Sequence, residues 1–194
     1  MMKIYFVRHG QTKFNSQRLI QGRIDEPLNK VGIKQAKESG QIIKGLNFNI
    51  DKIVTSPLSR AFETAHLIAR KTNYKDNIEV VQKFVERDFG KYELTKIADS
   101  FPKVMADGFT EEGFEDSPTL IKRIKETIDE LYQKYQGKTI IATVHAHVIR
   151  TAYILFDNKK YNYVNFFLGN CSIHEFDYDG NNLTFINDYN NEEE

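Results

Sequence analysis

Three short strand-like runs, separated by segments with helical periodicity, constrain the fold of this chain most strongly. They cover residues 4–7, 51–55 and 139–144, and most of their side chains are apolar, β-branched or aromatic. Runs without polar alternation are typical of strands that are buried on both faces of a parallel sheet. Strands that alternate with helices predict an α/β three-layer sandwich, with a mostly parallel central sheet and helices on both faces.

Capping residues and apolar spacing predict the other elements. Asn29 is a good N-cap for a helix that ends at Gly45, and Ser56-Pro57 and Ser117-Pro118 both have the residue types that begin helices. The remaining predictions are a strand over 78–84, a helix over 148–156, and an edge hairpin formed by 171–176 and 183–185 around the Asp179-Gly180 turn.

Composition favours one domain in a reducing compartment. The 194 residues suit a single domain over 1–188, with 189–194 as a disordered acidic tail. Lys plus Arg equals Asp plus Glu at 27 each, which gives no electrostatic reason to expect nucleic acid or an anionic membrane as partner. A single cysteine, no signal-peptide pattern at the N-terminus and no run near the ~20 apolar residues of a membrane span predict a cytoplasmic protein.

Polar residues follow each of the three buried runs. Arg8-His9 comes after the first, Ser56 to Arg60 after the second, and His145 after the third. If the strands are parallel neighbours, these groups gather at one edge of the sheet, where α/β folds bind ligands. Paired arginines suit a phosphate dianion, and free N–H groups at the helix start after Ser56-Pro57 would add to its binding. An imidazole can attack phosphorus and leave again.

These residues also resemble a known family. The matching positions, in order along residues 3–170, are V-R-H-G-Q-T at 7–12, Asn15, Gln21-Gly22, Pro27-Leu28, Gly32, Gln35-Ala36, S-P-L-S-R-A at 56–61, Glu63-Thr64, Glu86, Phe89-Gly90, His145 and Val148-Ile149-Arg150. The set resembles the histidine phosphatase superfamily, which includes the cofactor-dependent phosphoglycerate mutases.

The resemblance implies a role for each site residue. His9 would be the nucleophile that becomes a phosphohistidine, and Glu86 the general acid that protonates the leaving oxygen and then activates water. Arg8, Arg60 and His145 would form the phosphate pocket, with Asn15, Gln21, Gly22 and Ala146 near the substrate. To act as an acid, Glu86 must start protonated, and we expect burial near a bound phosphate dianion to raise its pKa. No cofactor or metal is implied.

Structural alternatives exist for several of these residues. Glu86 could be an ordinary surface carboxylate that pairs with Arg87, and Arg60 a solvated residue in the first turn of a helix. His145 and His147 could suggest a metal site, but strand geometry would direct them to opposite faces, and no carboxylate completes a ligand set nearby in sequence. The family usually has glycine at positions 146 and 147, so His147 could add an imidazole to the pocket.

Water access bears on the choice of reaction. A mutase must keep its phosphoryl group from water, and only residues 91–116 are available here to cover the site. The sequence therefore favours a phosphatase acting on a small phosphorylated metabolite. A phosphoglycerate mutase is the first alternative, and a non-catalytic phospholigand-binding module the second. The aromatic stretch from Tyr161 to Phe167 could form a homodimer patch.

Overall fold

The computed structural model describes residues 1–191 and contains one six-stranded sheet in the order β3-β2-β4-β1-β5-β6. Strands β1, β2, β3 and β4 are parallel, whereas β5 and β6 run antiparallel at one edge. The strands are β1 Met2–Arg8, β2 Lys52–Thr55, β3 Glu79–Val80, β4 Thr139–Val144, β5 Ile173–Tyr178 and β6 Leu183–Tyr189. The predicted edge hairpin is therefore confirmed.

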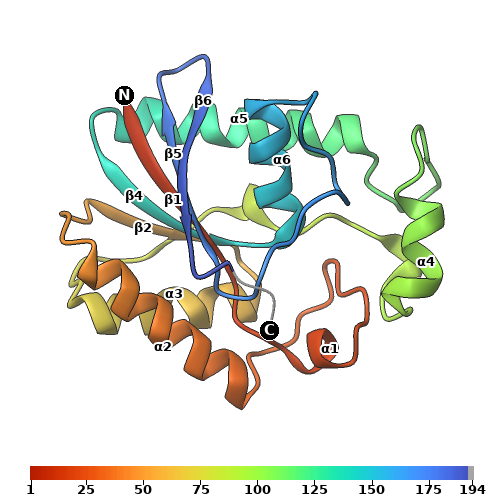
Figure 1. Cartoon of the computed structure of the whole chain (residues 1–194), viewed down its shortest axis with the longest axis horizontal. Coiled ribbons are helices and arrows are strands. Elements are labelled where there is room, and N and C mark those ends of the chain that lie inside the picture. Colours follow the sequence, from red (N-terminus) through yellow and green to blue (C-terminus); the bar gives the residue numbers. More distant parts are fainter. Residues whose placement is uncertain (192–194) are drawn as a thin grey trace.

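Helices cover both faces of this sheet, as the three-layer prediction requires (Figure 1). Side chains of β1 alternate between two cores: Ile4 and Phe6 pack with residues of α5 and α6, and Tyr5 and Val7 pack with residues of α2 and α3. The helices are α1 Lys13–Ser16, α2 Lys30–Gly45, α3 Ser59–Thr72, α4 Ile97–Val104, α5 Ser117–Tyr135 and α6 Ala146–Phe156, with short 3-10 turns at Gln82–Phe84 and Gly90–Tyr92.

The register of the parallel strands aligns their carboxyl ends. Arg8 of β1 lies opposite Val144 of β4, and Thr55 of β2 lies opposite Thr143. The residues that immediately follow β1, β2 and β4 are His9, Ser56 and His145. The predicted gathering of these groups at one sheet edge is confirmed.

Three local predictions were wrong. The predicted strand over 78–84 is only Glu79–Val80, because the chain then turns into a 3-10 helix that buries Phe84 beneath α5. Ser56 does not cap α3: the chain bends at Pro57 and Leu58, Leu58 takes the N-cap position, and the helix begins at Ser59. At the start of α5 the cap is Asp116, one residue before the predicted Ser117.

The C-terminal region is packed more tightly than predicted. Tyr163 is buried and Phe166 packs on Tyr153, so the exposed apolar side chains of the proposed dimer patch are mainly Val164 and Phe167. Tyr189, assigned to the tail, is the last residue of β6, and its hydroxyl donates to Glu175. Of the acidic tail, Glu192–Glu194 lie outside the described residues. Within residues 1–191 no helix is long and apolar enough to cross a membrane.

Candidate active site

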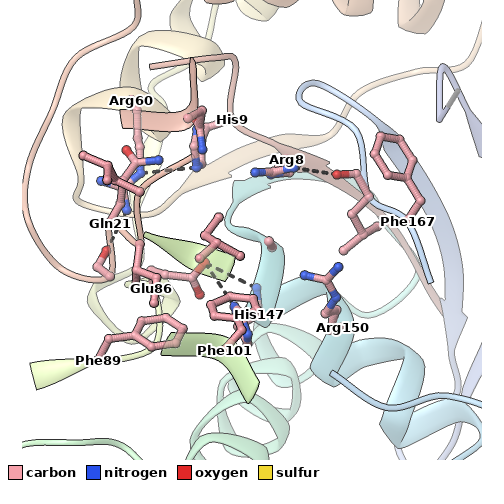
Figure 2. Close-up of a pocket in the computed structure, with 17 residues that line it drawn as sticks. Arg8, His9, Gln21, Arg60, Glu86, Phe89, Phe101, His147, Arg150 and Phe167 are labelled. Atoms are coloured by element: carbon pink, nitrogen blue, oxygen red, sulfur yellow. Dashed lines mark hydrogen bonds and ion pairs between the residues drawn. The ribbon is translucent and has the colours of Figure 1, made fainter. Parts of the chain in front are cut away.

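A pocket of about 410 Å³ lies at the carboxyl ends of the parallel strands (Figure 2). It combines charged groups with a largely apolar wall, and α4 with its flanking residues forms one side. The lining residues are Arg8, His9, Asn15, Leu19, Ile20, Gln21, Gly22, Arg60, Glu86, Phe89, Ile97, Phe101, Ala146, His147, Arg150, Phe167 and Leu168.

His9 is held as a neutral imidazole with a defined tautomer. Its Nδ1 lies 2.8 Å from the carbonyl oxygen of Gly10, and its Nε2 lies 3.2 Å from the Nε–H donor of Arg60. Because a carbonyl only accepts and a guanidinium only donates, Nδ1 carries the proton and Nε2 carries the lone pair. Burial, followed by the charge of Arg60, holds the pKa of His9 well below its usual value, so the ring is neutral at neutral pH.

Arg60 is 1% exposed, which excludes the solvated alternative. Besides its contact with His9, the guanidinium donates to the carbonyl oxygens of Ile24 and Gly22 at 2.8 and 2.7 Å. These carbonyls fix its position without neutralising it. Arg60 therefore presents a permanent positive charge beside the nucleophilic nitrogen of His9.

Glu86 is 7% exposed and lines the same pocket, so the surface ion pair with Arg87 is excluded. The Arg87 guanidinium turns away, toward the Glu115 carbonyl and Ser117. The Glu86 carboxylate accepts the backbone N–H of Arg87 at 2.8 Å and that of His147 at 3.3 Å.

The protein groups around Glu86 lower its pKa. Burial acts to raise it, but the contacts with His147, the proximity of His145 and the Arg87 N–H outweigh burial and hold the pKa below its usual value. Glu86 is therefore a carboxylate in this arrangement of protein groups, and the rise expected beside a bound phosphate dianion stays a prediction. A bound phosphate dianion would act in the opposite direction, by like-charge repulsion.

His145 lies beside His9, with 5.2 Å between the ring centroids. Its Nε2 is 2.7 Å from the Ser56 hydroxyl, which is why Ser56 serves the site and not the helix cap. The N-terminus of α3 is occupied instead: Asp25 accepts the Ser59 N–H at 2.7 Å and the Ser59 hydroxyl at 2.6 Å. The anion-binding contribution of this helix start stays a prediction, and the Ser59 N–H is already bound to a carboxylate.

Two further arginines face the pocket from the other side. Arg8 donates from Nη1 to the Leu168 carbonyl, and Arg150 donates from Nη2 to the Phe166 carbonyl at 3.0 Å. The Nε of each is buried without a hydrogen-bond partner within residues 1–191. Figure 2 shows the Arg150 guanidinium extending from α6 into the pocket, toward Arg8.

The structure also brings together the predicted substrate-binding residues, all of which line the pocket. The Thr12 hydroxyl contacts the side-chain oxygens of both Asn15 and Gln21, at 3.1 and 2.8 Å, which fixes these amides beside His9. Gly22 has a φ of +53°, and a Cβ there would lie 2.0 Å from the Glu93 carboxylate, so the turn requires glycine.

His147 and His145 do not point to opposite faces of a strand, because β4 ends at Val144 and both residues belong to the start of α6. His147 lies near Glu86, with 3.8 Å between its Nδ1 and the carboxylate, and burial lowers its pKa to about 4. Within residues 1–191 no three His, Cys, Asp or Glu side chains are grouped so that they could hold a metal ion.

Sequence reasoning assigned no site role to much of the pocket wall. Ile97 and Phe101 come from residues 91–116, which have no clear period, so the direction of their side chains could not be predicted, and Phe89 was matched to the family without a role. Arg150 did carry a signal: positions 146, 147 and 150 have the i, i+3 and i+4 spacing of one helix face. That spacing places Arg150 beside Ala146 and His147 on the pocket side of α6.

Comparison with known proteins agrees with this geometry. The model of the histidine phosphatase superfamily (branch 1) matches residues 4–191. The uncharacterized phosphatase PhoE of Bacillus subtilis is 32% identical over 149 residues, which are 77% of this chain and 74% of that protein. Phosphoglycerate mutase-like protein 4 of Arabidopsis thaliana is 31% identical over 161 residues, 78% of this chain and 69% of that protein.

A solved structure extends the likeness to the whole chain. It is the phosphoserine phosphatase mutant H9A of Entamoeba histolytica in complex with phosphoserine, with a TM-score of 0.84, 28% identity and 98% coverage of both chains. Together with the family match and the ordered site residues, this likeness shows that the chain belongs to the histidine phosphatase superfamily.

Proposed function

We propose that this protein is a phosphomonoester phosphatase that transfers the phosphoryl group of a small phosphorylated metabolite to His9 and then to water. The observation that carries the proposal is the position of the His9 Nε2 lone pair, which lies beside Arg60 in a pocket that also holds the Glu86 carboxyl group. A volume of about 410 Å³ suits a small molecule.

In the first half of the reaction, Nε2 of His9 attacks phosphorus while the bond from phosphorus to the ester oxygen breaks. The departing ester oxygen takes a proton from the Glu86 carboxyl group. The bound phosphate dianion favours the protonated form of Glu86 before this step. The charges of Arg8 and Arg60 stabilise the phosphoryl oxygens during transfer. The alcohol leaves, and His9 carries the phosphoryl group through Nε2.

In the second half, Glu86 is a carboxylate and takes a proton from a water molecule as that water attacks phosphorus. The bond between phosphorus and Nε2 breaks, phosphate is released, and the neutral imidazole returns. Asn15 and Gln21 are held beside the transferred group by Thr12 and would orient it. All the side chains given a role in these two steps line the pocket.

The direct test uses p-nitrophenyl phosphate without added metal. We expect turnover, and acid-labile, alkali-stable phosphate on the protein when the reaction is quenched; His9→Ala should lose both. His66→Ala removes an exposed imidazole outside the pocket and should retain both. Turnover that survives in His9→Ala would overturn the proposal, and phosphate binding without turnover would identify a binding module.

Phosphoglycerate mutase activity is the second candidate, because a phosphoglycerate mutase-like protein is among the relatives. The cover over the pocket is short, with α4 spanning only Ile97–Val104, which favours access of water. Supplying 3-phosphoglycerate with a catalytic amount of 2,3-bisphosphoglycerate separates the two. Release of phosphate supports the phosphatase, and formation of 2-phosphoglycerate without release of phosphate supports the mutase.

Two broader properties are also proposed. The single cysteine, Cys171, is buried and free, which fits a cytoplasmic location.

A homodimer stays a prediction, and it now rests on a smaller surface around the exposed Val164 and Phe167. Size-exclusion chromatography with light scattering measures the oligomeric state.

A further inference from the structure

The charge balance of the pocket leaves one arginine without a role in phosphoryl transfer. Three guanidinium groups line it, those of Arg8, Arg60 and Arg150, against a single carboxyl group, that of Glu86. Asp25 and Glu93, just outside the lining, also act on Arg60, whereas among residues 1–191 Arg150 has no carboxylate besides Glu86 acting on it. If Glu86 is protonated when the ester is bound, as the proposed function requires, and the phosphate dianion lies at His9 with Arg8 and Arg60, the charge of Arg150 has no anion from the described part of the protein. The third charge would remain buried beside the substrate without an anion, which is costly.

Position identifies Arg150 as the arginine left over. Arg60 is committed to His9, and Figure 2 shows Arg8 between His9 and Arg150, while Arg150 enters from α6 on the side away from Arg60. The Arg150 side chain therefore lies toward the part of the pocket where the organic group of the substrate must extend.

The polar contacts of Arg150 are incomplete. One of its N–H groups donates to the Phe166 carbonyl, and its Nε is buried without a partner; its guanidinium also lies 5.5 Å from the Phe166 ring. No carboxylate within residues 1–191 forms an ion pair with Arg150 or with Arg8. Burial and the nearby charge of Arg8 lower the pKa of Arg150 to about 10, so the group is still charged at neutral pH.

The neighbouring wall offers a small organic group no other charged partner. It consists of Phe101, Phe167, Leu168 and other apolar side chains, with His147 neutral at neutral pH. A planar guanidinium in such surroundings binds a carboxylate through two parallel hydrogen bonds. A neutral alcohol in the same place would leave both the charge and the buried Nε unmatched.

We propose that Arg150 is a specificity-determining residue that binds a carboxylate on the substrate, so that this enzyme prefers phosphomonoesters of small hydroxy or amino acids. The proposal rests on the proposed function for the position of the phosphate. Arg150 takes no part in bond breaking, and its removal should change which esters are used and not whether esters are hydrolysed.

Matched substrate pairs test this preference. Phosphoserine and phosphoethanolamine differ by one carboxylate, and 3-phosphoglycerate and glycerol 3-phosphate differ by a carboxylate in place of a hydroxymethyl group. For the wild-type protein we expect kcat/KM to be about 10- to 100-fold higher for the acid of at least one pair, the range of a hydrogen bond to a charged group. Equal values within both pairs would overturn the proposal.

Variants assign the preference to the residue. Arg150→Met should remove the preference by lowering kcat/KM for the acid, mainly through KM, while turnover of phosphoethanolamine and of p-nitrophenyl phosphate is retained. Arg150→Lys, which keeps the charge without the planar fork, should retain part of the preference. Lys159→Met removes an exposed cation just after α6 and should change neither.

A purely structural role for Arg150 predicts a different result. If the residue only anchors the Phe166 carbonyl, Arg150→Met should lower kcat/KM for every substrate by the same factor, and that outcome would overturn the proposal.

Binding separates this proposal from the proposed function. Calorimetry on His9→Ala, which does not depend on turnover, should show tighter binding of phosphoserine than of phosphoethanolamine, and Arg150→Met in that background should abolish the difference. If turnover is absent but this difference is found, the proposed reaction fails and the carboxylate site stands.

Discussion

At the scale of single residues, the site depends on the protonation states of two groups. The Gly10 carbonyl fixes the proton of His9 on Nδ1, and burial keeps the ring neutral, so Nε2 is available for attack. Glu86 is ionised by its protein surroundings because the neighbouring donors outweigh its burial. To act as the proposed acid, Glu86 must therefore take up a proton when the substrate binds. The negative charge of the substrate phosphate favours this uptake.

The proton of Glu86 can be tested through the leaving group. Glu86→Gln keeps the size of the side chain but cannot donate an acidic proton, so we expect kcat for an alkyl ester such as phosphoserine to fall about 10²- to 10⁴-fold. With p-nitrophenyl phosphate the leaving anion is stable and the first step should be much less affected. A stoichiometric burst of p-nitrophenolate followed by slow turnover is then expected. Equal losses in the first step for both esters would contradict the acid role.

His147 is the residue at which this chain departs most from the family pattern, which usually has glycine. Its ring stacks on Tyr163 at 5.5 Å and meets the edges or faces of Phe89 and Phe101 at 5.1 and 5.9 Å. His147 thus connects α6 to Phe89 and to Phe101 of α4, and it also lies beside Glu86. The His147 side chain is therefore part of the pocket wall.

At the scale of elements, the start of α2 supports the loop that carries His9. Asn29 caps α2 as predicted, accepting the Gly32 N–H at 2.8 Å. The first turn then lies directly against residues 10 and 11: a Cβ on Gly32 would be 2.1 Å from the Gln11 carbonyl oxygen. The absence of a side chain at Gly32 lets the helix set the backbone position of the nucleophile loop.

Gly32→Ala tests this support. Because the clash is with backbone, the loop must move, and we expect destabilisation of about 1–3 kcal/mol together with a loss of kcat/KM of up to about 100-fold. Gly45→Ala is the control: it lies at the other end of α2, a Cβ there meets nothing within 4 Å, and stability should stay the same or rise. Urea unfolding and p-nitrophenyl phosphate turnover measure both effects. Similar behaviour of the two variants would contradict this account.

At the scale of the whole molecule, four buried histidines couple stability to pH. His9, His145, His147 and His174 all have pKa values lowered by burial, to about 4 for His147 and about 3 for His174. An unfolded imidazole has a pKa near 6.5, so below that pH the unfolded chain binds protons that the folded chain does not. The stabilisation is complete above pH 6.5 and is lost as the pH falls toward the folded values.

We therefore expect the free energy of unfolding to fall between pH 7 and pH 5, with about 2 kcal/mol from each of His147 and His174 and further losses from His9 and His145. His147→Gln should make the fall smaller by about one such contribution, whereas His66→Gln, at an exposed position, should leave it unchanged. Urea unfolding at the two pH values measures the differences. The same pH dependence in wild type and His147→Gln would show that this ring is not buried as a neutral group.

Much of the fold and of the candidate site was predictable from sequence, for a physical reason that applies to particular elements. Buried parallel strands must be continuously apolar, so residues 4–7 and 139–144 were visible, and the residues that follow such strands share one edge. The strand predicted over 78–84 failed because β3 is an edge strand, where pairing needs few residues and where the core drew Phe84 inward. The residue types at 78–84 revealed neither the short pairing of β3 nor the burial of Phe84.

The sequence alone determined the three-layer architecture, the family and the identity of the groups at the sheet edge, because periodicity and local motifs are properties of neighbouring residues. Three features required the folded chain: Ser56 contacts His145 and does not cap α3, Glu86 is ionised by its neighbours, and Arg150 joins Arg8 in the pocket. Each of these depends on groups that are far apart in the chain, and burial and charge act through space.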